Sequence, residues 1–303
     1  MMQRLKEQKK SVTVKPKLMK PNLVVIGSRK CATTSLHDYL GRHPEISMSA
    51  EKELNFFVKE LRWKKGIRWY ENQFLAPAKV RGESSPNYTR FPLWKGVPER
   101  MHSVLPHAKL IYLVRDPIER IISAYYHDLK GGTETRAFEE IMGPDLEQSP
   151  YVHISRYYFQ LTQFLKYYSR SQILVVAAED LKTNPYGVIR HIFEFLGVDS
   201  AFRSPEFQVM KNVSAESVFS RKPCKLERLA ASYEEKNQWL GQIARATVPL
   251  YLKLRKRKPR EPQTELIRPI PSPRLKQRLR EVFKADVQKL RAWTGQSFEA
   301  WSV

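Results

Sequence analysis

Residues 21–41 read PNLVVIGSRKCATTSLHDYLG. The apolar run Leu23–Ile26 predicts a short buried strand, Gly27 opens the loop that follows, and a helix is expected to end near Gly41. A loop between a strand and a helix start offers unpaired backbone N–H groups and the positive end of the helix dipole, which together bind phosphate. The stretch therefore predicts a strand–loop–helix unit with an anion-binding loop.

Two more units of the same kind follow along the chain, at residues 108–132 and 172–197. The first combines a buried-strand pattern at Leu110–Val114 with a helix start that Asp116 can cap, and the second places a strand at Ile173–Ala177. Strands that alternate with helices imply a parallel sheet covered on both faces. The predicted fold class is α/β, a P-loop-like three-layer fold with a central parallel sheet flanked by helices.

The length of 303 residues fits one catalytic domain with appendages. Residues 1–20 are basic and poor in apolar side chains, which predicts a flexible basic arm, and residues 21–303 form the expected domain. Within this domain, residues 253–265 read as an exposed basic loop. Residues 272–303 are expected to hold a C-terminal helix that docks back on the core.

The formal net charge of +22 indicates anionic ligands and leaves the fold open. We expect no specific binding of nucleic acid. The two cysteines, Cys31 and Cys224, fit a reducing compartment better than a disulfide scaffold. No apolar run approaches the roughly 20 residues of a membrane span, and the basic start lacks an apolar signal segment. We therefore expect a cytoplasmic protein without a membrane span, unless a native N-terminal anchor is missing from the sequence.

The loop differs from the NTPase pattern G-x-x-x-x-G-K-[ST]. Gly27 matches its first glycine, but Ala32 and Thr33 stand where the second glycine and the lysine should be. The match to a kinase or ATPase therefore fails. Lys30 lies earlier in the loop, and Thr33 with Thr34 offers two hydroxyls at the helix start. This arrangement suits a phosphosulfate anion without an obligatory metal.

Taken together and in order, the loop and the segments after it resemble the sulfotransferases that depend on 3′-phosphoadenosine 5′-phosphosulfate (PAPS), most closely the heparan sulfate (carbohydrate) sulfotransferase domains. The resemblance runs from Pro21 to the C-terminus and is weakest between residues 200 and 265. The stretches that carry it are SRKCATT (28–34), EKELNFF (51–57), KKGIRWY (64–70), GESSPNY (82–88), RDPIERIISAYYH (115–127) and LREVFKADVQKLRAWTGQSFEAW (279–301).

The resemblance implies sulfuryl transfer from PAPS to a hydroxyl or amine acceptor, with a carbohydrate as the expected acceptor and 3′,5′-adenosine bisphosphate as product. It also implies the donor-binding residues. The 5′-phosphosulfate loop corresponds to Arg29, Lys30, Cys31, Ala32, Thr33, Thr34 and Ser35, and the 3′-phosphate pair to Arg115 and Ser123. Arg221 and Lys222 are added as nucleotide contacts. The equal alternative is that these two residues belong to a solvated charge cluster.

Two residues are expected to carry the chemistry. Lys30 is the natural stabiliser of charge on the leaving phosphate oxygen, and the acceptor proton needs a base within hydrogen-bond reach. The resemblance assigns that base to Glu53. Glu83, His102 and His107 are competing candidates for the base. The usual histidine pKa favours the two histidines, whereas the position in the motif favours Glu53.

The chain departs from the family pattern at three points. Ser84 stands where a lysine often follows the glutamate, Asn55 replaces a histidine that often precedes the two phenylalanines, and Cys224 has no nearby partner to close a loop. The acceptor side is therefore expected to differ. The net charge permits an acidic saccharide as partner. A P-loop kinase-like phosphotransferase and a non-enzymatic polyanion-binding module stay open as alternatives.

Overall fold

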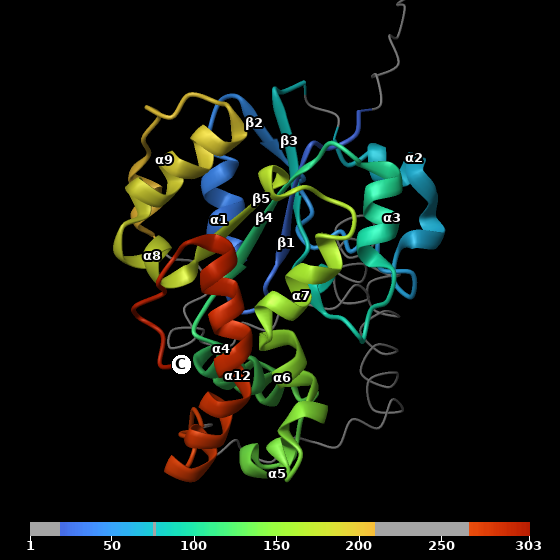
Figure 1. Ribbon diagram of the computed structural model, residues 1–303. Coiled ribbons are helices and arrows are strands. Elements are labelled where there is room, and N and C mark those ends of the chain that lie inside the picture. Colours follow the sequence, from blue (N-terminus) through green and yellow to red (C-terminus); the bar gives the residue numbers. More distant parts are fainter. Residues whose placement is uncertain (1–18, 75–76, 210–266) are drawn as a thin grey trace, which may run out of the picture. The chain divides into compact units, whose positions relative to one another are not determined.

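The computed structural model describes residues 19–74, 77–209 and 267–303 (Figure 1). The described residues 19–74, 77–209 and 269–303 belong to one compact unit, in which all the elements below lie. Five parallel strands form its sheet in the order β2-β3-β1-β4-β5. The strands are β1 (Leu23–Gly27), β2 (Ile46–Met48), β3 (Val80–Ser84), β4 (Lys109–Val114) and β5 (Ile173–Ala177).

Helices cover both faces of this sheet. They are α1 (Thr33–Leu40), α2 (Gly66–Glu71), α3 (Val97–Val104), α4 (Pro117–Gly131), α5 (Phe138–Met142), α6 (Pro150–Ser155), α7 (Tyr157–Phe164), α8 (Ala178–Thr183), α9 (Pro185–Leu196) and α12 (Pro273–Thr294). Short 3₁₀ turns lie at η1 (Trp63–Lys65), η2 (Pro86–Thr89), η3 (Leu146–Gln148), η4 (Arg170–Gln172) and η5 (Pro205–Gln208). The all-parallel sheet between helical layers confirms the predicted fold class.

Alternation along the strands builds the two halves of the core. In β1, Leu23 and Val25 point to the face covered by α1, α8 and α9, whereas Val24 and Ile26 point to the face covered by α3, α7 and α12 (Figure 1). All four side chains are fully buried. A central strand buried on both faces explains why its sequence is continuously apolar.

Helix α4 begins where its sequence predicts. Asp116 accepts hydrogen bonds from the backbone N–H groups of Ile118 and Glu119 at 2.8 and 3.0 Å, and Pro117 occupies the first position, where its missing N–H costs nothing. The cap places Arg115 immediately after β4 and before the helix start. That position is the edge of the sheet at which ligands of parallel α/β folds bind.

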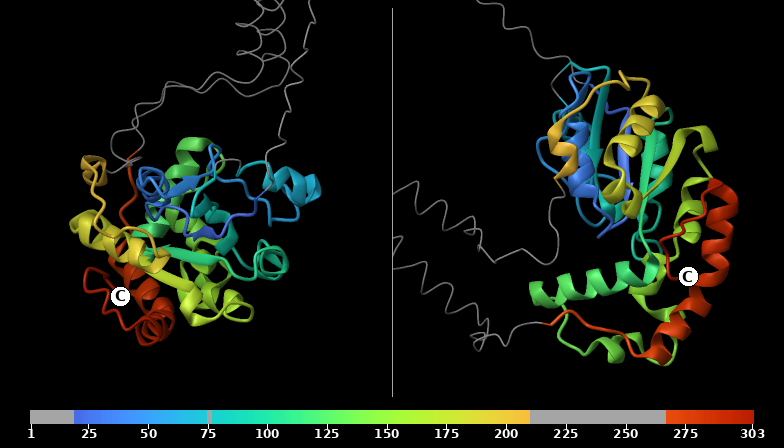
Figure 2. Two further views of the ribbon diagram at one scale, coloured as in Figure 1. Left: turned by 90° about the horizontal axis from the view of Figure 1, so that it is seen from above. Right: turned by 90° about the vertical axis from the view of Figure 1, so that its left-hand side faces the viewer.

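The helix expected after Ser272 is α12, which Ser272 caps through Leu275 N–H. It packs on α7 and α4 (Figure 2). Most of the arm at residues 1–20 and the basic loop at 253–265 lie outside the described residues. Among the helices that the structure describes, none is long and apolar enough to cross a membrane.

Candidate active site

The site lies at the carboxyl end of β1, in the middle of the sheet. After β1, the chain forms β2 and β3 on one side of that strand and then β4 and β5 on its other side. The direction in which the sheet is wound therefore reverses at β1. In open α/β sheets, ligands bind outside the carboxyl ends of the strands at such a switch point. Three segments meet at this edge: the loop 28–32, the turn after β3 and the start of α4.

The loop 28–32 leads into the start of α1 at this edge of the sheet. Lys30 and Ala32 adopt left-handed conformations, with φ of 72° and 61°, and Ala32 is the N-cap of α1. Alanine has no side-chain oxygen to accept from the helix start, and no side-chain cap is formed. The first N–H groups of α1 at Thr33, Thr34 and Ser35 therefore suit an anion.

Lys30 is the central cation of the loop. Burial lowers its pKa, and Arg29 and Arg115 lower it further because their positive charges lie close by. The ammonium has neither a hydrogen bond nor an ion pair with any residue that the structure describes. A bound anion would relieve the repulsion among these three cations, so the site favours a ligand of negative charge.

Arg29 is already paired within the protein. Its Nη2 lies 2.5 Å from Asp128 Oδ1 and its Nη1 3.2 Å from Asp128 Oδ2, and Asp128 also accepts from the Tyr151 hydroxyl at 3.0 Å. This pairing fixes the loop to α4. The side chain of Arg29 is therefore part of the wall of the site.

Cys31 faces the interior. Its side chain is fully buried, with Sγ 3.8 Å from the Tyr157 hydroxyl, and burial raises the pKa of the thiol to about 11. The thiol stays protonated and unreactive at neutral pH. A contact from Cys31 to a ligand in the loop would be made by its backbone.

Arg115 precedes α4 in the chain, whereas Ser123 lies within the helix. Arg115 forms an ion pair with Glu119 at 3.3 Å, its side chain is 28% exposed, and its charge acts on Lys30. Ser123 lies two turns further along the helix and is buried. The other two proposed nucleotide contacts, Arg221 and Lys222, fall outside the described residues.

Glu53 lies beside the end of β3. Its backbone N–H donates to the carbonyl of Ser84 at 2.9 Å, at a left-handed φ of 64°. The carboxylate is 46% exposed and forms an ion pair with Lys52 at 2.8 Å. This exposure and its place at the carboxyl edge of the sheet leave Glu53 accessible to an acceptor.

The competing base Glu83 is a buried structural group. It accepts hydrogen bonds from the hydroxyls of Tyr70 at 3.0 Å, Tyr88 at 2.7 Å and Ser85 at 2.5 Å, and its side chain has no exposed surface. Burial raises its pKa despite these donors. Glu83 therefore has no access to an acceptor.

The two competing histidines lie away from the loop. His107 is exposed just before β4 begins, at the opposite edge of the sheet. His102 lies on α3, where its ring packs against Tyr168 with centroids 5.3 Å apart.

His127 is a site residue that the sequence reasoning missed. Burial has the largest effect and lowers the pKa of His127, and the positive charges of Lys30 and Arg29 lower it further. The negative charges of Asp128 and Glu53 raise it. The imidazole of His127 is therefore within electrostatic range of both Lys30 and Glu53. The signal was present in the sequence, because His127 stands one helical turn after Ser123 on α4.

Ser84 is the position at which the family pattern often has lysine. Its Oγ lies 3.0 Å from His37 Nδ1, and His37 Nε2 lies 3.2 Å from the carbonyl of Ser49. Burial, and then Lys52, lower the pKa of His37 to about 4. At neutral pH this position therefore holds a hydroxyl bonded to an uncharged imidazole.

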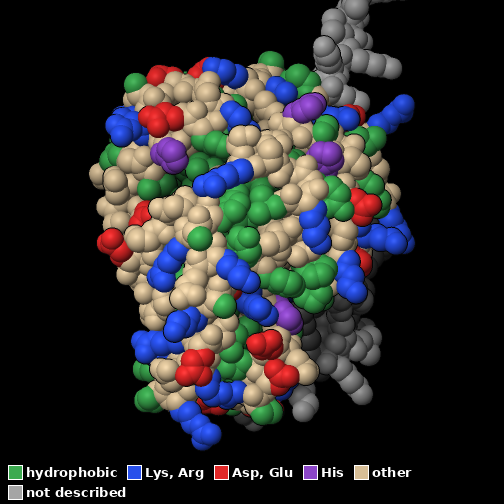
Figure 3. All heavy atoms as spheres, in the orientation of Figure 1, with side chains coloured by type: hydrophobic (Ala, Val, Ile, Leu, Met, Phe, Trp, Pro, Cys, Tyr) green, Lys and Arg blue, Asp and Glu red, His purple; other side chains and the backbone are tan. Residues whose placement is uncertain are grey.

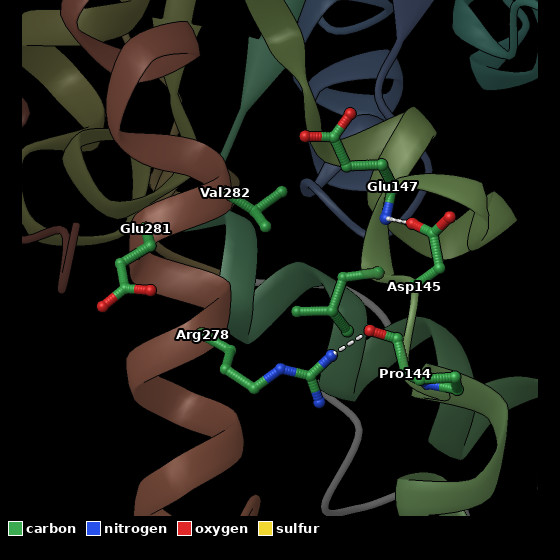
Figure 4. Close-up of a pocket in the computed structure, with 7 residues that line it drawn as sticks. Pro144, Asp145, Glu147, Arg278, Glu281 and Val282 are labelled. Atoms are coloured by element: carbon green, nitrogen blue, oxygen red, sulfur yellow. Dashed lines mark hydrogen bonds between the residues drawn. The ribbon is translucent and has the colours of Figure 1, made fainter.

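One pocket among the described residues lies away from the loop. A shallow pocket lies between α12 and the segment 144–147, where Arg278 donates to the carbonyl of Pro144 (Figure 4). It shares no residue with the loop. On the face shown in Figure 3, Lys and Arg side chains are spread widely among apolar patches. Within the described ranges, no group of three His, Cys, Asp or Glu residues is arranged to hold a metal ion.

Comparisons with known proteins identify the family of the chain. A family model described as "Sulfotransferase domain" matches residues 20–242. The chain is 31% identical over 189 residues to human heparan sulfate glucosamine 3-O-sulfotransferase 5, covering 59% of this chain and 54% of that protein. It is 28% identical over 201 residues to bifunctional heparan sulfate N-deacetylase/N-sulfotransferase 1 of Caenorhabditis elegans, covering 62% of this chain and 22% of that protein.

A solved structure shows the same fold. The sulfotransferase from Alicyclobacillus acidocaldarius superposes with a TM-score of 0.64 at 23% identity, covering 94% of this chain and 100% of the other. By contrast, this chain spans only 22% and 54% of the lengths of the two curated relatives above.

Proposed function

Because the chain belongs to the sulfotransferase domain family, whose model matches residues 20–242, we propose that it is a PAPS-dependent sulfotransferase. It transfers a sulfuryl group from PAPS to a hydroxyl or amine of a carbohydrate acceptor and releases 3′,5′-adenosine bisphosphate. The observation that carries this proposal is Lys30, a cation without a partner among the described residues, in an anion loop at the switch point of the sheet.

The donor occupies the loop in this proposal. Backbone N–H groups of residues 29–35 hold the 5′-phosphosulfate at the start of α1, and Arg115 with Ser123 holds the 3′-phosphate. Arg221 and Lys222 are proposed as further nucleotide contacts. Lys30 neutralises the charge that develops on the leaving phosphate oxygen, so the reaction does not require a metal for that step.

The acceptor approaches from the side of Glu53. The acceptor oxygen or nitrogen bonds to sulfur as the bond between sulfur and the phosphate oxygen breaks, and the acceptor proton passes to a base. We propose Glu53 as that base. His127 is the second candidate, because its ring titrates under the influence of both Lys30 and Glu53.

A carbohydrate acceptor is supported by the relatives, two of which are named for heparan sulfate. The kinase-like alternative is weakened by Ala32 and Thr33, which replace the glycine and lysine of the NTPase loop. A polyanion-binding module without catalysis would leave the anion loop and Lys30 without a role. The direct test is a screen of saccharide acceptors that measures release of 3′,5′-adenosine bisphosphate from PAPS.

The Glu53→Gln variant tests the proposed base. Glutamine keeps the shape of the side chain but cannot take up the proton, so turnover should fall by about 10²–10⁴-fold while the affinity for PAPS stays unchanged. Turnover with PAPS and the best acceptor, and binding of 3′,5′-adenosine bisphosphate by calorimetry, measure the two effects.

Glu60→Gln serves as the matched control, since Glu60 is an exposed carboxylate of the same segment. Normal turnover in Glu53→Gln, combined with a large loss in His127→Asn, would transfer the role of base to His127. Normal turnover in both variants would remove both candidates.

A further inference from the structure

Most cations around the loop are already paired. Carboxylate partners are found in the ion pairs Arg29–Asp128, Arg115–Glu119 and Lys52–Glu53. Arg120 is fully buried and donates to Ser155 Oγ and the carbonyl of Tyr151. Lys30, Arg90 and Arg120 have no ion pair with a carboxylate among the described residues, and the burial of Arg120 shuts it off from a ligand. The proposed donor accounts for Lys30, so Arg90 is left without an assigned anion.

Arg90 follows η2, directly after the turn that leaves β3. Its guanidinium is partly buried, and its Nε atom is shut off from solvent without a hydrogen-bond partner. Burial lowers its pKa, and the charge of Arg29 lowers it further. A half-buried guanidinium that lacks a counter-ion is costly unless a ligand supplies one.

A chain of hydrogen bonds links this guanidinium to the candidate base. Arg90 Nη1 donates to Asn87 Oδ1 at 3.0 Å, Asn87 Nδ2 donates to Asn55 Oδ1 at 3.1 Å, and Asn55 Nδ2 donates to the carbonyl of Glu53 at 2.9 Å. The Asn55 backbone N–H also donates to Ser85 Oγ at 3.0 Å, which fixes the chain to the end of β3. The side chain of Arg90 is thus tied to the backbone of Glu53.

We propose that Arg90 is a specificity-determining residue, which binds an anionic group of the acceptor while Asn87 and Asn55 hold it in register with Glu53. The anionic group is a carboxylate or a sulfate ester on the acceptor saccharide, near the hydroxyl or amine that receives the sulfuryl group. This inference rests on the proposed sulfotransferase function and extends it to acceptor selection. A guanidinium is suited to this role because its planar fork matches both oxyanions.

The position of Arg90 assigns it to the acceptor rather than the donor. Its hydrogen bonds run through Asn87 and Asn55 toward Glu53, on the β3 side of the loop, whereas Arg115 lies beyond β1 at the end of β4. Asp128, whose charge acts on Arg90, is paired with Arg29. An acceptor anion can therefore approach Arg90 without strong repulsion from it.

The test compares three acceptors that differ only in one group: an oligosaccharide with a uronic acid carboxylate, its methyl ester, and the same backbone with a sulfate ester at that position. Wild-type protein should favour the charged acceptors over the ester by about 10–100-fold in kcat/KM, the range of a hydrogen bond to a charged group. Arg90→Gln should reduce this preference to about 1 through KM, with KM for PAPS unchanged. Comparison of the two charged acceptors identifies the preferred anion.

Arg90→Lys keeps the charge but loses the fork, so it should retain part of the preference. Arg190→Gln, on α9, is the control for the loss of one positive charge. Correct folding of each variant is checked by stabilisation with 3′,5′-adenosine bisphosphate, and acceptor binding in the presence of that product gives a second readout that does not require turnover.

A preference that survives in Arg90→Gln overturns the inference, and so does a raised KM for PAPS with acceptor preference intact. In both cases the donor is still used, and the proposed function stands. Failure of wild-type protein to bind the bisphosphate or to consume PAPS removes the proposed function and the role of Arg90 with it.

Discussion

His37 shows at the scale of a single residue how the fold sets a charge. Its imidazole is hydrogen-bonded between Ser84 and Ser49, and burial followed by Lys52 lowers its pKa from the usual 6.5 to about 4. At a pH between these two pKa values, His37 carries a proton in the unfolded chain but not in the folded protein. Stability therefore rises with pH across this window and is lost as the pH falls from about 6.5 to about 4.

We predict that wild-type protein loses about 2 kcal/mol more stability than His37→Asn when the pH is lowered from 7 to 5. Urea unfolding at both pH values measures the difference. His191→Asn is the control, because His191 is mostly exposed on α9. Equal pH dependence of wild type and His37→Asn would show that His37 titrates normally.

At the scale of elements, α12 supplies the cap of α7. Asp286 accepts hydrogen bonds from the backbone N–H groups of Tyr158 and Phe159, each at 2.9 Å, while Arg156 at the N-cap position gives none. The carboxylate is largely buried and lies among the apolar residues of α12 that face the core. A side chain distant in sequence thus completes the first turn of α7.

Asp286→Ala should lower the free energy of unfolding by about 1–3 kcal/mol, since it leaves two buried N–H groups unpaired. Asp286→Asn keeps one acceptor oxygen, so it should lower the free energy of unfolding by less than Asp286→Ala does. Urea unfolding measures both, with Glu281→Ala on the exposed side of α12 as the matched control. A loss in Asp286→Ala no larger than in Glu281→Ala would contradict the capping role.

At the scale of the whole molecule, the net charge of +22 and the anion loop predict strong linkage between folding and anionic ligands. At about 100 times its Kd, 3′,5′-adenosine bisphosphate should add about 2.7 kcal/mol to the free energy of unfolding. Thermal unfolding should show a rise in Tm, and added salt should reduce it.

Arg115→Ala should lose most of this shift, and 5′-AMP should give wild-type protein a smaller one. Lys284→Ala, an exposed lysine of α12, controls for the change in charge. If Arg115→Ala keeps both the full shift and the preference over 5′-AMP, the 3′-phosphate site has been assigned to the wrong residue.

Local signals in the sequence were sufficient for the fold class and for the loop. Continuous apolar runs predicted strands buried on both faces, and Asp116 with Pro117 marked the start of α4. These features depend on residues within a few positions of one another, so burial pattern and capping chemistry are readable along the chain. The position of the loop between β1 and α1 followed from the same local pattern.

Only the tertiary structure decided which side chains share the site. It brought Asp128 to Arg29, 99 residues away, and His127 within electrostatic range of Lys30 and Glu53. It also withdrew Glu83 from solvent, because two tyrosines and a serine converge on its carboxylate. Such neighbours depend on the order in which strands pair and on the face toward which each side chain points, and strand order is a property of the whole packed core.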